Sequence, residues 1–246
     1  MKRHFIGLTD TGVVRTANQD NYFVDEELGR FFIVADGMGG HSAGEVASRS
    51  IAEALFPETS ELAEVDTLCD RVDWIEDRLL GVDRSLHERA REMGPGVVIG
   101  STVVSLTIEG STGVVLWAGD SRLYRLRQGR LEIVTRDHNP ITDLLDSGAI
   151  TEEEALASDT NVITRAVGGQ RPLDLDVAVF DVEQTDTLLL CTDGLYRELA
   201  ETEISKILQQ VDLEAAASEL VELTLSRPAL DNVTLLLLRG VDNVSH

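Results

Sequence analysis

The stretch of sequence that decides this fold is Phe31-Phe32-Ile33-Val34-Ala35-Asp36-Gly37-Met38-Gly39-Gly40-His41. It opens with an unbroken apolar run, which is typical of a strand buried on both faces. The run ends in a carboxylate, Asp36, and continues into a turn rich in glycine. Because glycine has no Cβ atom, a metal ion or a phosphate could approach this backbone closely. The stretch therefore predicts a buried strand with a binding site at its end.

Other apolar runs also carry an aspartate at one end. Asp120 follows residues 114–119, Asp193 follows 187–192, and Asp231 comes just before 233–238. If these carboxylates met Asp36, each pair would repel by roughly 4 kcal/mol at about 4 Å and an effective dielectric constant near 20. Divalent cations would remove the repulsion, and oxygen ligands favour Mg²⁺ or Mn²⁺ over zinc. The alternative is that each aspartate is an ordinary turn residue, but the coincidence favours a metal site.

The composition is that of an acidic globular chain. Its 246 residues are 43% hydrophobic, and we expect one domain over residues 1–246 because no linker-like stretch divides them. The net charge of −23 argues against nucleic acid and anionic membrane surfaces as partners. An enzyme that acts on phosphates would need cations to reverse this field locally. The alternative is that the charge provides solubility alone.

The cysteines and the N-terminal residues suggest a cytoplasmic protein. Cys69 and Cys191 are too few for a disulfide framework, and we expect both to be reduced core residues. The first residues contain no apolar signal region, and no later run is long enough to span a bilayer. A cytoplasmic location is therefore expected.

A compact polar segment at 15–21 contains two further candidate site residues. Arg15 could hold a phosphate through two hydrogen bonds, and Asp20 could join the cation site. The alternative for both is a solvated loop with a salt bridge. His41 precedes a helix that Ser42 and Glu45 are expected to open as a capping box. His41 could be an acid or a substrate contact, or it could only pack against the helix or cap it.

Periodicity predicts helices and strands in separate blocks. Apolar residues spaced by three and four over 65–86 predict a long helix that pairs antiparallel with the helix after Ser42. The remaining expected elements are strands at 4–8, 103–108, 113–118, 123–127, 131–135, 175–180 and 187–191, and helices at 201–209 and 213–225. Gln128-Gly129 is expected to be a hairpin turn. Because strands joined by short turns pair antiparallel, a Rossmann-like parallel sheet is excluded.

Two surface features each allow two interpretations. Positive charge gathers around the expected hairpin at Arg122, Arg125, Arg127, Arg130 and Arg136. These arginines could receive a phosphoprotein partner, or they could form the exposed face of a hairpin. The irregular acidic segment 139–164 predicts short helices and a mobile flap beside the active site. The alternative for this segment is a tolerated surface insertion.

The motifs along the chain resemble those of one known family. They are, in order, Arg15-x-x-Asn18-Gln19-Asp20, the 36–41 turn, Gly100-Ser101-Thr102, Gly119-Asp120-Ser121-Arg122, Thr192-Asp193-Gly194 and Asp231-Asn232. Over residues 7–238 they are similar to motifs of metal-dependent protein serine/threonine phosphatases of the PPM/PP2C type, small single-domain bacterial members in particular. The resemblance implies an α+β fold, a four-layer αββα sandwich of two antiparallel β-sheets flanked on each side by a pair of antiparallel helices.

The resemblance also implies a set of metal ligands. Asp36 resembles the carboxylate that bridges two Mn²⁺ or Mg²⁺ ions. Asp193 and Asp231 look like ligands of the first ion. Asp20 and the carbonyl of Gly37 look like ligands of the second ion, partly through waters.

Three more residues take a role from the resemblance. Asp120 is similar to the aspartate that, with Asp193, holds a weaker third ion in bacterial members. Arg15 matches the phosphate-binding arginine, and Asn232 would orient Asp231 or a metal-bound water. In such a site a water bridging two ions is acidified, and the resulting hydroxide attacks phosphorus in line.

The chain departs from the family at two positions. Met38 stands where some members have a histidine assigned as general acid, so a water on the third ion or His41 becomes the candidate acid. Gln19 stands where many members have glutamate, which weakens its case as a ligand.

The expected function is therefore hydrolysis of phosphoserine and phosphothreonine in proteins. Phosphorylated proteins and a cognate Ser/Thr kinase are the expected partners, and a monomer is expected. One alternative is a catalytically silent, metal-dependent module that binds phosphoproteins, whose sign would be the loss of a metal aspartate. Another is a purely structural acidic protein, which would leave the recurring strand-end aspartates unexplained.

Overall fold

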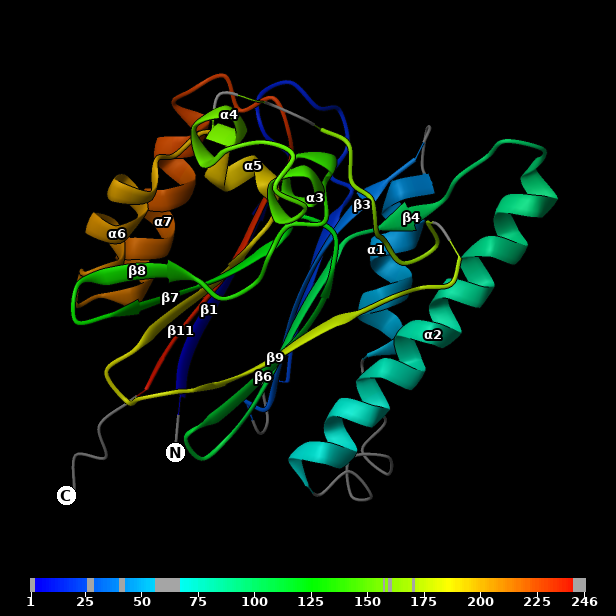
Figure 1. Ribbon diagram of the computed structural model, residues 1–246. Coiled ribbons are helices and arrows are strands. Elements are labelled where there is room, and N and C mark those ends of the chain that lie inside the picture. The colour runs from blue at the N-terminus through cyan, green and yellow to red at the C-terminus, as the bar shows by residue number, and fades with distance from the viewer. Residues whose placement is uncertain are drawn as a thin grey trace.

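Two antiparallel β-sheets form the centre of the protein (Figure 1). The computed structural model describes residues 3–25, 29–39, 43–55, 67–156, 158, 161–169 and 171–240. In the five-stranded sheet the strand order is β1 (Arg3–Asp10), β11 (Val233–Gly240), β10 (Thr187–Cys191), β7 (Arg122–Arg127) and β8 (Arg130–Ile133). In the six-stranded sheet it is β2 (Asp20–Val24), β3 (Phe31–Met38), β5 (Val103–Glu109), β6 (Thr112–Ala118) and β9 (Asp176–Asp181), with β4 (Gly100–Ser101) paired to β3. The expected pair of antiparallel sheets is confirmed.

Strand β3 is buried on both of its faces, as its sequence predicted. Phe32 and Val34 pack with Leu190 and Leu236 of the opposite sheet. On the other face, Ile33 and its alternating neighbours pack under the helices. Because successive side chains of a strand point to opposite faces, a strand between a sheet and a helix layer needs an unbroken apolar run.

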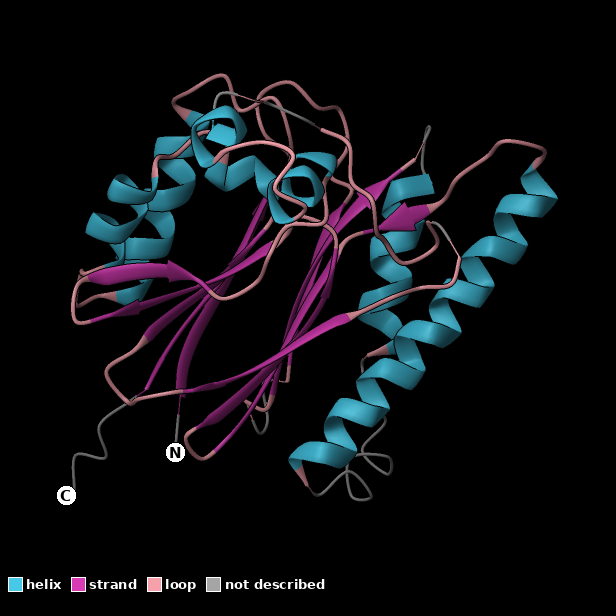
Figure 2. Cartoon of the chain, in the orientation of Figure 1, coloured by secondary structure: helices cyan, strands magenta, loops and turns pink. Residues whose placement is uncertain are grey.

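Helices cover the outer face of each sheet (Figure 2). Helices α1 (Ala43–Ala54) and α2 (Leu68–Met93) share a core with the six-stranded sheet, and they run in opposite directions (Figure 1). Helices α6 (Glu201–Leu208) and α7 (Leu213–Leu225) share a core with the five-stranded sheet. The short helices α3 (Pro140–Asp146), α4 (Glu152–Leu156) and α5 (Asp193–Tyr196) gather at one end of the sandwich. None of the helices in these described ranges is long and apolar enough to cross a membrane.

Helix α2 is longer than its apolar periodicity predicted. It begins after Thr67, whose side chain and that of Asp70 form a capping box, and it ends at Met93, before Gly94. The early part of the predicted range, and the predicted cap at Ser42, lie outside the described residues. The extension beyond residue 86 is mostly polar, and Ala90 is its buried residue.

The expectation that neighbouring strands pair through short turns is wrong at residues 119–121. Strands β5 and β6 pair, as do β7 and β8, but β6 and β7 belong to different sheets. The chain crosses between the sheets at Gly119, where φ is +114° and a Cβ atom would lie 2.6 Å from Thr102 Cγ2. Only glycine tolerates both the conformation and the contact. The predicted hairpin turn is confirmed, since Gln128 and Gly129 both have positive φ, at 50° and 79°.

The two cysteines differ in environment. Cys191 is buried in β10, as expected, whereas Cys69 is exposed in the first turn of α2. The expectation of a core position for Cys69 is therefore wrong. Its neighbours Leu68 and Val72 carry the apolar side of the helix instead.

The arginines around the β7–β8 hairpin are paired with carboxylates. Arg127 binds Asp186 at 2.7 Å and also Asp181, and Arg125 pairs with Glu132. Arg122 binds Asp137 at 2.7 Å, and Arg136 pairs with Asp146. Internal ion pairs thus engage most of this positive charge. The observation argues against a phosphoprotein docking patch and favours the simpler interpretation of a hairpin surface.

Candidate active site

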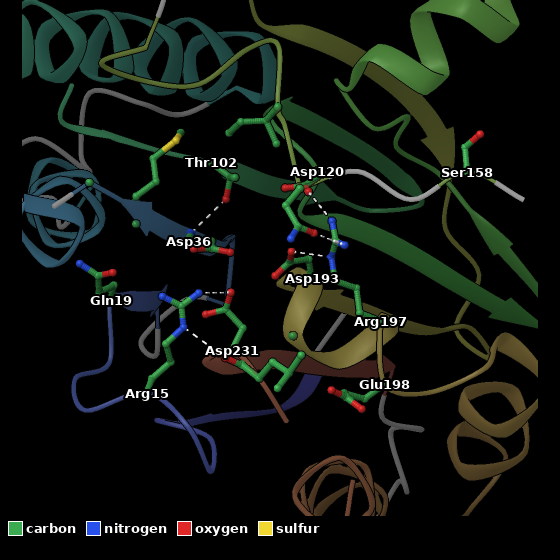
Figure 3. Close-up of a pocket in the computed structure, with 17 residues that line it drawn as sticks. Arg15, Gln19, Asp36, Thr102, Asp120, Ser158, Asp193, Arg197, Glu198 and Asp231 are labelled. Atoms are coloured by element: carbon green, nitrogen blue, oxygen red, sulfur yellow. Dashed lines mark hydrogen bonds and ion pairs between the residues drawn. The ribbon is translucent and has the colours of Figure 1, made fainter. Parts of the chain in front are cut away.

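A cavity of about 780 Å³ lies at the ends of strands from both sheets, beside helix α5. Its lining comes from segments far apart in sequence: the loop before β2, the end of β3, the β6–β7 crossing, the 158–163 segment, helix α5 and the start of β11. Figure 3 shows the carboxylates of Asp36, Asp193 and Asp231 turned toward one another, while Glu198 points away. The cavity is the meeting point of the conspicuous sequence motifs.

The predicted strand-end aspartates all line this cavity. They are Asp36, Asp120, Asp193 and Asp231. Asp36 directly follows the buried apolar run in β3, and Asp193 opens helix α5 with one residue between it and the end of β10. Asp36, Asp120 and Asp193 thus follow buried strands and Asp231 precedes one, and all of them reach the same cavity.

Asp20 belongs to the cluster of aspartates but does not face the cavity. It is the cross-strand partner of Asp36, but it is not among the residues that line the cavity. Its Oδ2 accepts a hydrogen bond of 2.9 Å from Thr192 Oγ1, and only 8% of the residue is exposed. Gln19, its neighbour, faces the cavity instead. Asp20 therefore lies behind Asp36, as part of the same buried cluster.

The buried carboxylates disfavour one another's negative charge. Burial, followed by repulsion from Asp20, Asp193 and other aspartates, holds the pKa of Asp36 well above its ordinary value. Burial and neighbouring aspartates also raise the pKa of Asp20 and that of Asp120 to about 7. A cluster of this kind is stabilised by protons or by cations.

The donor set suits hydrated divalent cations. Asp193 Oδ1 is buried, and no described residue offers it a hydrogen bond. No three His, Cys, Asp or Glu side chains in the described ranges are close enough to enclose an ion by themselves. Mg²⁺ keeps several waters and binds through one or two carboxylates, so a loose set of carboxylates fits it better than a closed cage would. Zinc would require a tighter set.

The Gly37 backbone approaches helix α1 without side chains between them. A Cβ atom on Gly37 would lie 2.1 Å from Gly44 O, and one on Gly44 would lie 2.6 Å from Gly37 O. The pair of glycines therefore allows the first turn of α1 to pack directly on the peptide that follows Asp36. The Gly37 carbonyl is held next to the cavity by this contact.

Thr102 braces Asp36, a role that the sequence did not suggest. Thr102 Oγ1 accepts a hydrogen bond of 3.0 Å from the Asp36 N–H, and the Thr102 N–H donates to Asp36 O at 2.8 Å. The Thr102 hydroxyl also contacts Ser121 Oγ at 2.7 Å. These bonds fix the backbone on which the Asp36 carboxylate stands.

Two arginines reach the carboxylates from opposite sides of the cavity (Figure 3). Arg15 Nη2 donates to Asp231 Oδ2 at 2.8 Å, and Arg15 Nε donates to Leu230 O at 3.2 Å. Arg197 Nε donates to Asp193 Oδ2 at 2.7 Å. Arg15 was predicted as a site residue, but Arg197 was missed. Its spacing of four from Asp193 on a helical turn was the signal that could have found it.

The side chain of Asn232 holds a loop rather than orienting Asp231. Its Nδ2 donates to Thr11 O at 2.8 Å and to Ala17 O at 3.0 Å, and its Oδ1 accepts from the Gln19 N–H at 2.8 Å. The Asn232 backbone N–H donates to Asp231 Oδ1 at 2.8 Å. The expected influence on Asp231 therefore comes from the main chain, while the side chain fixes the segment that carries Arg15.

Arg122 supports the Asp120 turn from below the cavity. Its guanidinium lies 3.7 Å from the centre of the Tyr196 ring, and it binds Asp137 through two hydrogen bonds of 2.9 and 2.7 Å. Tyr196 in turn donates from its hydroxyl to Asp120 O at 2.9 Å. Arg122 thus positions the site instead of receiving a partner at the surface.

Two residues of the 36–41 turn bear on proton donation. Met38 lines the cavity, and its thioether has no proton to donate. His41 lies outside the described residues, so its predicted role stays a prediction.

Titration of this cluster predicts how stability depends on pH. With metal removed by a chelator, Asp20 and Asp120 bind protons up to a pKa of about 7 in the folded state but only up to about 3.8 when unfolded. The folded state holds more protons between these values, so its stability falls as pH rises from about 4 to about 7. Mn²⁺ should therefore raise the melting temperature more at pH 8 than at pH 5. Asp120→Asn is the matched variant and should flatten the chelated profile; a chelated melting temperature that rises toward pH 8 would contradict the prediction.

Comparisons with known proteins agree with this site. A family profile described as Protein phosphatase 2C matches residues 13–227. Over 233 residues the chain is 34% identical to "Serine/threonine phosphatase stp" of Listeria welshimeri, covering 93% of this chain and 92% of that protein. The structure superposes with a TM-score of 0.86 and 36% identity on PppA, described as a key regulatory component of T6SS in Pseudomonas aeruginosa, over 98% of this chain and 99% of that one. The catalytic domain of the phosphatase PstP in complex with two manganese ions matches with a TM-score of 0.83 and 31% identity, over 98% and 99% of the two chains.

The chain therefore belongs to the protein phosphatase 2C family, and it is a metal-dependent protein serine/threonine phosphatase of the bacterial PPM/PP2C type. The resemblance seen in the motifs is confirmed, as is the αββα sandwich that it implied. A catalytic role is favoured over a silent binding module.

Proposed function

We propose that the cavity is the active site for hydrolysis of phosphoserine and phosphothreonine, with Asp36 as the carboxylate shared by two divalent ions. The observation that carries the proposal is the convergence of four strand-end aspartates on one cavity, with the Asp193 Oδ1 atom left without a described hydrogen-bond partner. Cations would relieve both the mutual repulsion and the unmet oxygen.

The remaining ligand roles follow from position. Asp193 and Asp231 flank Asp36 in the cavity and suit the first ion, while the Gly37 carbonyl suits the second. Asp20 lies behind Asp36 and suits a role through water or through its charge. When bound, a pair of Mn²⁺ or Mg²⁺ ions supplies a nucleophilic water at neutral pH and neutralises charge on the phosphate.

Arg15 binds and orients the phosphate in this proposal. Its side chain is 48% exposed at the cavity, and its planar fork matches two phosphate oxygens. The bond to Asp231 keeps that fork directed toward the carboxylates before the substrate arrives. Since Met38 cannot protonate the departing serine or threonine oxygen, a cavity water or His41 is the proposed proton source.

Several finer expectations stay proposals. They include use of Mg²⁺ as well as Mn²⁺, a weaker third ion between Asp120 and Asp193, a cognate kinase, a monomeric state, a cytoplasmic location and a single domain over residues 1–246. The segment 139–164 does border the cavity through Ser158, Asn161 and Ile163. This supports its placement beside the active site, while its mobility as a flap stays a prediction.

The test is phosphate release from a phosphothreonine peptide. Turnover with Mn²⁺ is expected to fall at least about 100-fold in EDTA, because the attacking water then loses its activation, and to return when Mn²⁺ is restored. p-Nitrophenyl phosphate serves as the control substrate, because it needs no peptide binding. Turnover that survives EDTA would contradict the proposal. A folded protein that binds Mn²⁺ and hydrolyses neither substrate would instead support the silent binding module.

A further inference from the structure

Arg197 is placed where it can take the position of a metal ion. It directly follows helix α5, and its Nε donates to Asp193 Oδ2 at 2.7 Å. Its Nη2 lies 3.7 Å from Asp120 Oδ2, so one guanidinium faces both carboxylates. Figure 3 shows the side chain reaching from α5 toward this pair. Both carboxylates are at least partly neutralised by a cation that belongs to the chain.

The same guanidinium holds Asn161, which belongs to the 139–164 segment. Arg197 Nη1 donates to Asn161 Oδ1 at 2.6 Å. Asn161 and Ile163 line the cavity on this side. The three nitrogens of one fork thus connect the segment to the two aspartates, and a movement of the guanidinium would change both contacts together.

We propose that Arg197 is a positioning residue that competes with a divalent ion for the Asp120–Asp193 pair and, through Asn161, fixes residues 161–163 against the cavity. This rests on the proposed function, because it assumes ions at Asp36. An ion held by Asp120 and Asp193 would lie about 2.1 Å from their oxygens and would be repelled by a guanidinium bound to the same atoms. Ion and guanidinium therefore compete for one place.

The competition couples metal concentration to the segment. When a divalent ion occupies the Asp120–Asp193 pair, Arg197 leaves Asp193, and its bond to Asn161 loses the geometry that supports it. Residues 161–163 are then released from the cavity. The coupling is reciprocal, so anything that holds Asn161 in place also weakens ion binding at that pair. Asp193 is also a proposed ligand of the first ion. Arg197 binds its Oδ2 and leaves its Oδ1 without a described partner, so the exchange concerns Oδ2 and Asp120 while Oδ1 serves the first ion.

The experiment measures Mn²⁺ binding by titration calorimetry and amide hydrogen exchange of the peptide covering residues 150–164. In Arg197→Ala the affinity of the weakest Mn²⁺ site should rise about tenfold or more, or binding at this site should become measurable for the first time. Exchange of the segment should be fast in this variant at any metal concentration. In the native protein it should become fast only once Mn²⁺ saturates the weakest site.

Two matched variants separate the parts of the proposal. Asn161→Ala should speed exchange while leaving the Asp193 ion pair in place, so its weakest Mn²⁺ event should shift little. Arg197→Lys keeps the charge without the planar fork, so exchange should rise while ion affinity stays near native. Unchanged weak-site affinity in Arg197→Ala, with the two tighter events intact, would overturn the inference. If the native protein showed no tighter Mn²⁺ binding events, the proposed function itself would be refuted.

Discussion

Asp36→Asn is expected to lower kcat/KM for a phosphothreonine peptide by roughly 1,000-fold in saturating Mn²⁺. Asparagine keeps the shape of the side chain, but it offers one neutral oxygen where two ions would share a carboxylate. The loss should fall on kcat more than on KM, because Arg15 still binds the phosphate. Steady-state kinetics on the peptide and on p-nitrophenyl phosphate provide the measurement.

The same substitution should stabilise the protein once metal is removed. The pKa of Asp36 is held well above its ordinary value by burial and by the surrounding aspartates, so its charge is disfavoured in the fold. Asparagine removes that charge, and the melting temperature in EDTA at pH 8 should rise. Asp73→Asn, at an exposed position on α2, is the control and should change neither activity nor melting temperature. Native-like turnover, or a lower melting temperature in EDTA, would show that Asp36 is not at the centre of a charged cluster.

Gly37→Ala is expected to lower the free energy of unfolding by about 3 kcal/mol or more. The new Cβ would lie 2.1 Å from Gly44 O and 2.6 Å from Gln19 O, and neither backbone atom can move as a flexible side chain would. Helix α1 and the loop before β2 would both have to shift away from β3. Since these elements hold Arg15, Gln19 and the Gly37 carbonyl near Asp36, Mn²⁺ affinity should fall as well. Denaturant unfolding and calorimetry measure the two effects.

Gly81→Ala is the matched control for that substitution. At Gly81, inside helix α2, the nearest atom to an added Cβ is Arg84 Nη2 at 3.8 Å. Alanine there should stabilise the protein by about 0.5–1 kcal/mol, because it restricts the unfolded chain and fits a helix. If the two substitutions had the same effect, the close contact between β3 and α1 would not be a determinant of stability.

The local sequence was sufficient to find most strands, most helices and the candidate carboxylates, whereas the short strand β2 was missed. Alternation and apolar runs report on burial over a few residues, so β3 and β10 could be recognised from their own side chains. The aspartate at the end of each run was visible for the same reason. The sandwich was inferred from the resemblance of the ordered motifs to a known family, because no single apolar run specifies which strands pair.

Contacts between distant segments decided the rest. The crossing at Gly119 placed β6 and β7 in different sheets, although only three residues separate them. Asp20 and Asp36 are cross-strand partners, yet Asp20 is buried behind Asp36. The side-chain amide of Asn232 forms hydrogen bonds with the 11–19 loop. Arg197 follows helix α5, whereas Asp120 lies in the crossing between β6 and β7. The two side chains face each other only because the fold brings these segments to the same cavity. The partners of long side chains and carboxylates depend on which distant segments the sheets bring together. The local sequence therefore shows which groups are charged, but not which of them meet.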